Sequence, residues 1–168
     1  MGEADKPGAL RIRAATVADA PAIWRIYNQG IEDRLATLAG EMRPLAEIEA
    51  WFAEPRFQAW VAESFRQVVG WASLEAYREG KAFASMAEMS VYVERAWRRH
   101  AVGQLLGRAL IEQARARGLE KLIGYLLERN TSSHKLVEKL GFRTVGVHYR
   151  HGPPEAARPN VVVVELLL

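Results

Sequence analysis

The chain has 168 residues, of which 49% are hydrophobic and 26% charged, the balance of one globular domain large enough to bury its own core. It contains no cysteine, which excludes disulfides, thiolate metal sites and a cysteine nucleophile, and its four scattered histidines predict no metal site. The net charge of +3 is mild and the basic residues gather between positions 95 and 117, which favours a small anionic ligand over a dedicated nucleic-acid binder.

The N-terminal region predicts a strand followed by a helix. Residues 1–9 are polar and we expect them to be flexible, whereas residues 10–15 alternate as a strand does. Thr16 and Asp19 resemble a capping box that starts a helix, and Gly30 is expected to end it. The stripe expected to be buried on this helix comprises Ala20, Ile23, Trp24 and Tyr27.

A loop, a second helix and two strands are expected next. Residues 31–44 have no clean period and predict a loop, after which Pro44 opens a helix over residues 45–54. Residues 57–64 and 66–77 predict two strands joined by a tight turn. No apolar run reaches the length of a membrane span and the first residues lack a signal-peptide core, so we expect a cytoplasmic protein with no membrane contact.

The central region predicts a long strand over residues 82–93, a basic turn at 98–101 and an amphipathic helix that ends near Gly118. The apolar stripe of this helix comprises Val102, Leu105, Leu106, Ala109 and Leu110.

The C-terminal region predicts a strand over 121–128, a short helix from Asn130 to Gly141, and two strands over 143–150 and 160–168. With no internal repeat and no linker, residues 10–168 are expected to form one domain.

The turn before the central helix has the features of an anion site. A turn between a strand and a helix gathers unpaired N–H groups at the positive end of the helix dipole, which suits a phosphate. Arg98, Arg99 and His100 add charge and donors, while Ala101 and Gly103 leave room for close approach to the backbone. The alternative is a solvated basic turn in which Gly103 only relieves crowding.

This stretch resembles the acetyl-CoA signature Q/R-x-x-G-x-G/A of the GNAT superfamily of N-acetyltransferases, with Ala101 in place of the first glycine. A second element, N-x-x-S/A, is matched by Asn130 and Ser133 and is followed by LGF at 140–142. The resemblance covers about residues 10–168 and implies an α/β fold of the α+β kind. It implies a single domain with a mixed central sheet of about seven strands, splayed in the middle and flanked by about four helices.

The resemblance also implies acetyl-CoA as co-substrate and no metal. In these proteins the splayed strand hydrogen-bonds the pantetheine arm through its backbone, although its side chains can equally be core. The residues thus expected to bind acetyl-CoA are Val91, Tyr92, Val93, Arg98, Arg99, His100, Ala101, Val102, Gly103, Gln104, Asn130 and Ser133.

Within the superfamily the chain is most similar to the phosphinothricin and arsinothricin acetyltransferases. The segments that carry this likeness are IRAAT-x-AD, IYNQGIEDRLAT, GWASL, AEMSVYV and VGVHYRHG. It implies acetylation of the α-amino group of an amino acid or toxic analogue, such as phosphinothricin, arsinothricin, methionine sulfone or methionine sulfoximine. It also implies a homodimer and a role in antibiotic or herbicide resistance. The segment 153–160 departs from the group, having lost a tryptophan and an aspartate.

Glu88 is the predicted general base. Acetyl transfer needs a neutral amine, whereas an amino acid's ammonium is mostly protonated at neutral pH. Glu88 is a lone carboxylate in an apolar strand, where burial would raise its pKa to a useful value. A glutamate in this setting is the proposed base of the group that the chain resembles. The alternative is a strand carboxylate paired with a neighbouring arginine.

The general acid and the acceptor contacts are less defined by sequence. Where related enzymes carry a tyrosine or histidine that can reprotonate the thiolate, this chain has Val137, leaving His134, Tyr27 or solvent. For the acceptor we expect Arg78 and Lys81 to receive a carboxylate or phosphinate. Phe83 would form an apolar wall, and the alternative for this loop is simple solvation.

Three other functions stay open from the sequence. The chain could acetylate a protein N-terminus, a lysine or another small amine. It could be a non-catalytic module that binds acyl-CoA for regulation. A nucleic-acid-binding domain is the third, and we expect no nucleic-acid partner.

Overall fold

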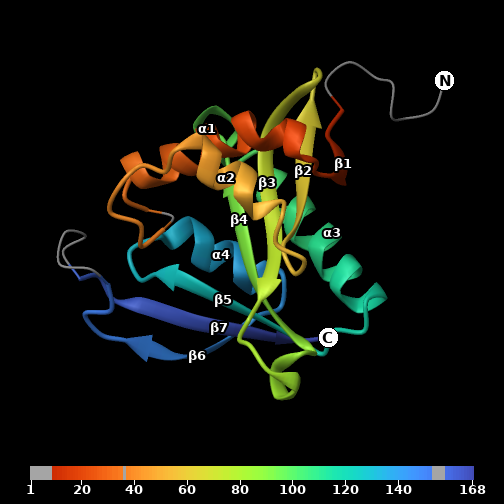
Figure 1. Ribbon diagram of the computed structural model, residues 1–168. Coiled ribbons are helices and arrows are strands. Elements are labelled where there is room, and N and C mark those ends of the chain that lie inside the picture. The colour runs from red at the N-terminus through yellow and green to blue at the C-terminus, as the bar shows by residue number, and fades with distance from the viewer. Residues whose placement is uncertain (1–8, 36, 153–157) are drawn as a thin grey trace.

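A computed structural model describes residues 9–35, 37–152 and 158–168. Its centre is one seven-stranded mixed sheet with the strand order β1-β2-β3-β4-β5-β7-β6 (Figure 1). The strands are β1 (Arg11–Ala14), β2 (Gln58–Ser64), β3 (Gln67–Ala76), β4 (Met86–Val93), β5 (Lys121–Leu127), β6 (Arg143–His148) and β7 (Val161–Leu167).

Four α-helices cover the two faces of the sheet. They are α1 (Ala20–Glu32), α2 (Leu45–Trp51), α3 (Val102–Ala116) and α4 (Thr131–Lys139). Figure 1 shows α1 and α2 together on one side of the sheet, with α3 on the other. The expected seven-stranded α/β fold with four flanking helices is therefore confirmed. No helix among the described residues combines the length and apolarity that a membrane span requires.

Several sequence-based boundaries were wrong. The helix expected over residues 45–54 ends at Trp51, and the strand expected over 143–150 ends at His148, before the left-handed turn at Arg150. Gly30 does not end α1, because the helix continues to Glu32 and buries Ile31 before Arg34 takes a left-handed conformation. Residues 82–85 are not part of a strand. The pairing of β4 with β3 ends at Ala87 and that with β5 ends at Met86, so the preceding residues have no strand beside them; residues Lys81–Phe83 form a 3-10 turn instead.

Leu105, which was expected in the apolar stripe of α3, is exposed, whereas Val102, Leu106 and Leu110 are buried. Several other local expectations hold. Asp19 accepts a hydrogen bond from the backbone N–H of Thr16 at 2.9 Å, as a capping box requires, and Gly118 and Gly141 take positive φ values of 72° and 90° after α3 and α4. The flexible segment expected at residues 1–9 lies, except for residue 9, outside the described residues.

The core has one layer on each face of the sheet. On one face the buried side chains of α1 and α2 pack against Trp71, which is only 1% exposed and stacks on Tyr92 at 4.7 Å between ring centroids. On the other face α3 packs against β1, β2, β3 and β4. The main side chains of this second layer are Ala62, Val69, Ala72, Leu74, Met89, Val102, Leu106, Leu110 and Leu122.

The sheet opens between β4 and β5. The two strands pair in parallel only from Met86 to Glu88, opposite Lys121 to Ile123. Beyond that point β4 stays paired with β3 as far as Val93, and β5 stays paired with β7 as far as Leu127. In Figure 1 the β2–β4 part and the β5–β7 part run in clearly different directions. The splay expected from the family resemblance is thus present.

We predict that Gly70→Ala destabilises the fold. A β-carbon at this buried position in β3 would lie 2.9 Å from Val102, 3.1 Å from Leu106 and 3.1 Å from the carbonyl oxygen of Tyr92, so α3 would have to move away from the sheet. Overpacking of this kind costs about 1–3 kcal/mol. Urea or thermal unfolding measures the loss.

Gly146→Ala is the matched control, since this glycine also lies in a strand but a β-carbon there meets nothing within 4 Å. Equal stability of the two variants would contradict the close packing of α3 on Gly70.

Candidate functional site

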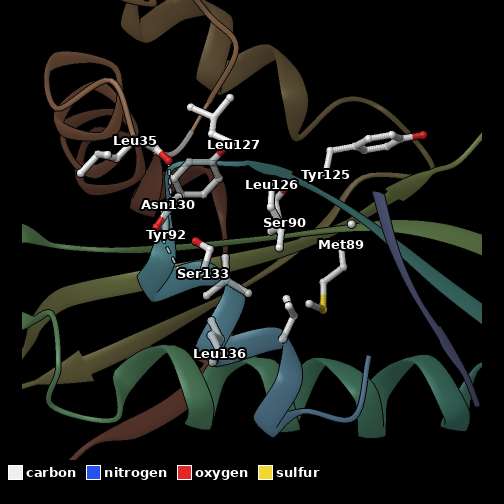
Figure 2. Close-up of a pocket in the computed structure, with 13 residues that line it drawn as sticks. Leu35, Met89, Ser90, Tyr92, Tyr125, Leu126, Leu127, Asn130, Ser133 and Leu136 are labelled. Atoms are coloured by element: carbon white, nitrogen blue, oxygen red, sulfur yellow. Dashed lines mark hydrogen bonds between the residues drawn. The ribbon is translucent and has the colours of Figure 1, made fainter. Parts of the chain in front are cut away.

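A pocket occupies the opening between β4 and β5. About 560 Å³ of open space lies between the two strands, with α4 along one side (Figure 2). The lining residues come from the loop after α1, from both strands and from α4: Leu35, Met89, Ser90, Val91, Tyr92, Gly124, Tyr125, Leu126, Leu127, Asn130, Ser133, Leu136 and Val137. Val91, Tyr92, Asn130 and Ser133 were predicted from the sequence to meet here.

Glu88 lies at the point where the sheet begins to open. It is the last residue of β4 that pairs with β5, and Met89, the next residue, already lines the pocket. The side chain is half-buried, and burial, followed by the negative charge of Glu75, raises its pKa above the ordinary glutamate value. Among the described residues no cation forms an ion pair with it, so the alternative of a paired strand carboxylate does not describe this structure.

Three further groups lie near Glu88, and two of them, Glu75 and Tyr125, were missed by the sequence reasoning. Glu75 is the direct cross-strand partner of Glu88, and Tyr92 and Tyr125 are both close enough for the charge of Glu88 to affect their pKa values. Burial is the main cause that raises the pKa of both tyrosines, so their hydroxyls stay protonated. The alternation of side chains along β3 could have indicated on which face of the sheet Glu75 lies. Only the register between β3 and β4 shows that it lies opposite Glu88.

The basic turn leads into α3 with open backbone donors. Arg99 and Ala101 have φ values of 67° and 60°, so both are left-handed, and no side chain caps the first turn of the helix. The first N–H groups of a helix have no partner within it. The N–H groups of Val102, Gly103 and Gln104 are therefore available, as the sequence predicted.

Val102 and Gly103, at the start of α3, contribute to packing within the protein. Val102 is buried in the core. A β-carbon on Gly103 would lie 3.3 Å from Leu136 and 3.5 Å from Val93, so the missing side chain lets α3 approach α4 and β4. This apolar packing, rather than open room for a ligand, explains the glycine at 103.

Arg98 is held by an acidic partner from α1. Its guanidinium lies 2.6 Å from Asp33, and its Nε donates to the carbonyl oxygen of Val93 at 3.3 Å. Arg95 contacts the same carboxylate at 2.8 Å, and hydrogen bonds from Arg95 and Arg98 lower the pKa of Asp33. Asp33 was not predicted, because its partners lie more than sixty residues away.

Arg99 and His100 are exposed beside the turn. The His100 Nδ1 atom lies 3.0 Å from the carbonyl oxygen of Arg98. Both side chains remain accessible to an anion at the N-terminus of α3.

Asn130 links the pocket to the loop after α1. Its Oδ1 accepts from the N–H of Ser133 at 3.1 Å, and its Nδ2 donates to the carbonyl oxygen of Leu35 at 2.5 Å. Arg129 donates to the carbonyl oxygen of Arg34 beside it. Figure 2 shows Leu35 and Asn130 next to each other at one end of the pocket, with Ser133 and Leu136 along α4.

The structure does not bring a general-acid candidate to the place where one was expected. Val137 lines the pocket and is buried. His134 has its Nε2 3.3 Å from the carbonyl oxygen of Leu127, and the Tyr27 hydroxyl lies 3.2 Å from that of Thr37. Neither residue lines the pocket.

The predicted acceptor residues lie in the loop after β3. Arg78 stacks over Tyr77 and Phe83, with its central carbon 5.1 Å and 5.8 Å from the two ring centroids. The positive charge of Arg78 acts to lower the pKa of Tyr125, whereas Lys81 is exposed at the start of the 3-10 turn. Arg78 and Phe83 are thus brought together beside the pocket.

No group of three or more histidine, aspartate or glutamate side chains in the described part of the chain is arranged to hold a metal ion.

Comparison with known proteins places these features in context. Residues 21–142 match the family model described as the acetyltransferase (GNAT) family. The chain is 34% identical to an L-methionine sulfoximine/L-methionine sulfone acetyltransferase of Pseudomonas aeruginosa, over 80% of this chain and 81% of that one.

Two solved structures share the fold closely. A ribosomal-protein-alanine N-acetyltransferase from Brucella melitensis has a TM-score of 0.89 and 32% identity, covering 94% of this chain and 99% of that one. The yncA protein from Salmonella typhimurium, solved with its cofactor acetyl-CoA, has a TM-score of 0.89 and 26% identity, covering 95% and 94%.

We predict that Ala101→Gly stabilises the protein by about 1 kcal/mol, because the left-handed conformation observed at Ala101 costs a residue with a β-carbon that much more than glycine. Thermal unfolding should therefore show a rise of roughly 2–4 °C.

Ala109→Gly, inside α3, is the control and should lower stability by about 1 kcal/mol, since glycine is unfavourable within a helix. A loss of stability in Ala101→Gly would show that the turn is not strained.

Proposed function

Since the chain belongs to the acetyltransferase (GNAT) family, we propose that it transfers an acetyl group from acetyl-CoA to the α-amino group of an amino acid or amino-acid analogue, with Glu88 as general base. The observation that carries this proposal is the place of Glu88 at the apex of the β4–β5 opening. There a half-buried carboxylate with a raised pKa directly precedes Met89, the first residue of β4 that lines the pocket.

The residues of the opening fit acetyl-CoA. Beyond Glu88, the edge of β4 that faces β5 has no strand beside it, so its backbone groups can pair with an extended amide-bearing chain. The uncapped N-terminus of α3 suits a diphosphate, with Arg99 and His100 beside it. Acetyl-CoA supplies the thioester carbon that the amine attacks.

The role of Glu88 follows from the protonation of the acceptor. An α-ammonium must lose a proton before its nitrogen can act as a nucleophile, and a carboxylate with a raised pKa is a better acceptor for that proton. The nitrogen then bonds to the acetyl carbon as the carbon–sulfur bond breaks, and the second proton that the nitrogen must lose to become a neutral amide passes to solvent. The sulfur leaves with the electron pair and takes up a proton, which solvent supplies because Val137 cannot.

For the acceptor we propose that Arg78 binds the α-carboxylate. The guanidinium lies over the rings of Tyr77 and Phe83, so it loses little freedom when it pairs with an anion. The relationship to an acetyltransferase of methionine sulfoximine and methionine sulfone supports an amino-acid analogue as the acceptor.

A second candidate acceptor is the N-terminal α-amine of a protein. The Brucella structure, whose name describes acetylation of a ribosomal-protein alanine, favours it. The two acceptors share the α-amine, but only the free amino acid carries an α-carboxylate next to it. A screen of amino acids, amino-acid analogues and peptides with acetyl-CoA, followed by thiol release, separates them. The homodimer, the cytoplasmic location and the role in resistance stay predictions.

We predict that Glu88→Gln lowers kcat/KM by about 10²–10⁴-fold, because general-base catalysis contributes that much, while acetyl-CoA still binds. Thiol-release kinetics measure the first quantity and calorimetry the second. In the wild type, kcat/KM should fall as the pH drops through the raised pKa of Glu88, since protonation removes the base. Glu112→Gln, on the exposed face of α3, should match the wild type. Full activity in Glu88→Gln would rule out the proposed base.

We predict that Arg78→Gln raises KM for amino-acid acceptors by roughly tenfold or more, because hydrogen bonds to a charged group contribute about 1.5–3 kcal/mol. An amine of the same shape without the carboxylate should be unaffected by the change. Lys81→Gln is the comparison, since this exposed residue lies in the same loop. If Arg78→Gln weakens both acceptors equally, Arg78 does not recognise the carboxylate.

A further inference from the structure

Glu75 and Glu88 face each other across two neighbouring strands. The antiparallel register of β3 and β4 places them directly opposite, in the same row as Ser73 with Ser90 and Trp71 with Tyr92. Side chains at directly opposed positions point to the same face, with β-carbons about 4.5–5.5 Å apart. The face is the one covered by α1 and α2, as the stacking of Trp71 on Tyr92 shows.

The carboxylate of Glu75 is held on the sheet by Ser73. The side chain of Ser73 is completely buried, and its hydroxyl donates to Oε1 of Glu75 at 3.0 Å. A glutamate near the end of a strand could turn to solvent, but this bond directs the carboxylate back along β3. Among the described residues no cation forms an ion pair with Glu75. Burial raises the pKa of the Glu75 carboxyl, and the hydrogen bond from Ser73 acts in the opposite direction by favouring the ionised form. Two carboxyl groups therefore meet at the apex of the opening, and neither is paired with a cation.

We propose that Glu75 is a positioning residue for Glu88, which keeps the base ready to accept the acceptor's proton. This inference rests on the proposed function and adds a residue to the same site. Like charges directly opposite each other destabilise a sheet. The hydrogen bond from Ser73 nevertheless holds the Glu75 carboxylate opposite Glu88. This unfavourable arrangement has a use in catalysis, because the repulsion raises the affinity of Glu88 for a proton and for the ammonium group that carries one.

The other groups around Glu88 do not supply this effect. Tyr92 on β4 and Tyr125 on β5 are neutral at working pH, because burial raises the pKa of each. Arg78, the nearby cation, stacks on aromatic rings, and its positive charge would lower rather than raise the affinity of Glu88 for a proton. Among the described residues, Glu75 is therefore the negative charge that acts on Glu88.

The test is the pH profile of Glu75→Gln, which removes the charge and keeps the shape. The acidic limb of kcat/KM reports the protonation of the free enzyme's base, and it should move to lower pH in this variant. At the pH where the wild type has half of its plateau activity, Glu75→Gln should keep roughly three-quarters or more of its own plateau. Comparison with each variant's own plateau makes the result independent of any change in acceptor binding.

Two further variants show whether the effect comes from charge. Ser73→Ala should move the limb in the same direction, because the loss of its hydrogen bond frees Glu75 and disfavours its ionised form. Glu75→Asp, which keeps the charge, should leave the limb closer to that of the wild type than Glu75→Gln does. Glu112→Gln should not move it.

An unchanged limb in Glu75→Gln, with activity still dependent on Glu88, would overturn this inference and leave the proposed function intact. Full activity in Glu88→Gln would instead overturn the proposed function itself. The two failures are thus distinguishable by the same assay.

Discussion

The site depends on the point at which β4 and β5 separate. Each strand keeps its other partner, since β4 remains paired with β3 through Val93 and β5 remains paired with β7 through Leu127. Two parts of one twisted sheet thus diverge from a shared apex at Glu88 and Ile123. Because unpaired backbone groups inside a protein are costly, such an opening is stable when solvent or a ligand can reach them. α4 forms one wall and leaves the pocket between the strands.

Charge is distributed unevenly along this opening. At one end the uncapped N-terminus of α3 provides backbone donors, and Arg99 and His100 lie beside it. At the apex the glutamates of β3 and β4 provide negative charge. The positive charge of Arg98 is largely taken up by Asp33. An elongated ligand with one anionic end would therefore bind in a single orientation, with that end at the N-terminus of α3 and the other end near the carboxylates.

Much of the fold could be predicted from local pattern, because the hydrophobic period and the capping residues act over a few residues. Asp19 starts the first helical turn and Gly118 follows the end of α3, as expected. The failures involve distant partners. Gly30 stays helical because Ile31 finds a buried place in the core, and Ser85 lies beyond the strand pairing that the pattern suggested. Neither fact is contained in the sequence nearby.

The same limit applies to the site and changes how its motif residues are understood. Three of them already have structural partners: Arg98 pairs with Asp33, Gly103 allows contact with Leu136, and Asn130 caps α4 while it holds the carbonyl of Leu35. Each of these contacts fixes the backbone on one side of the opening. The motif therefore specifies the shape of the opening through contacts within the protein. No sequence pattern of this kind identifies Glu75, because only the strand register shows that it lies opposite Glu88.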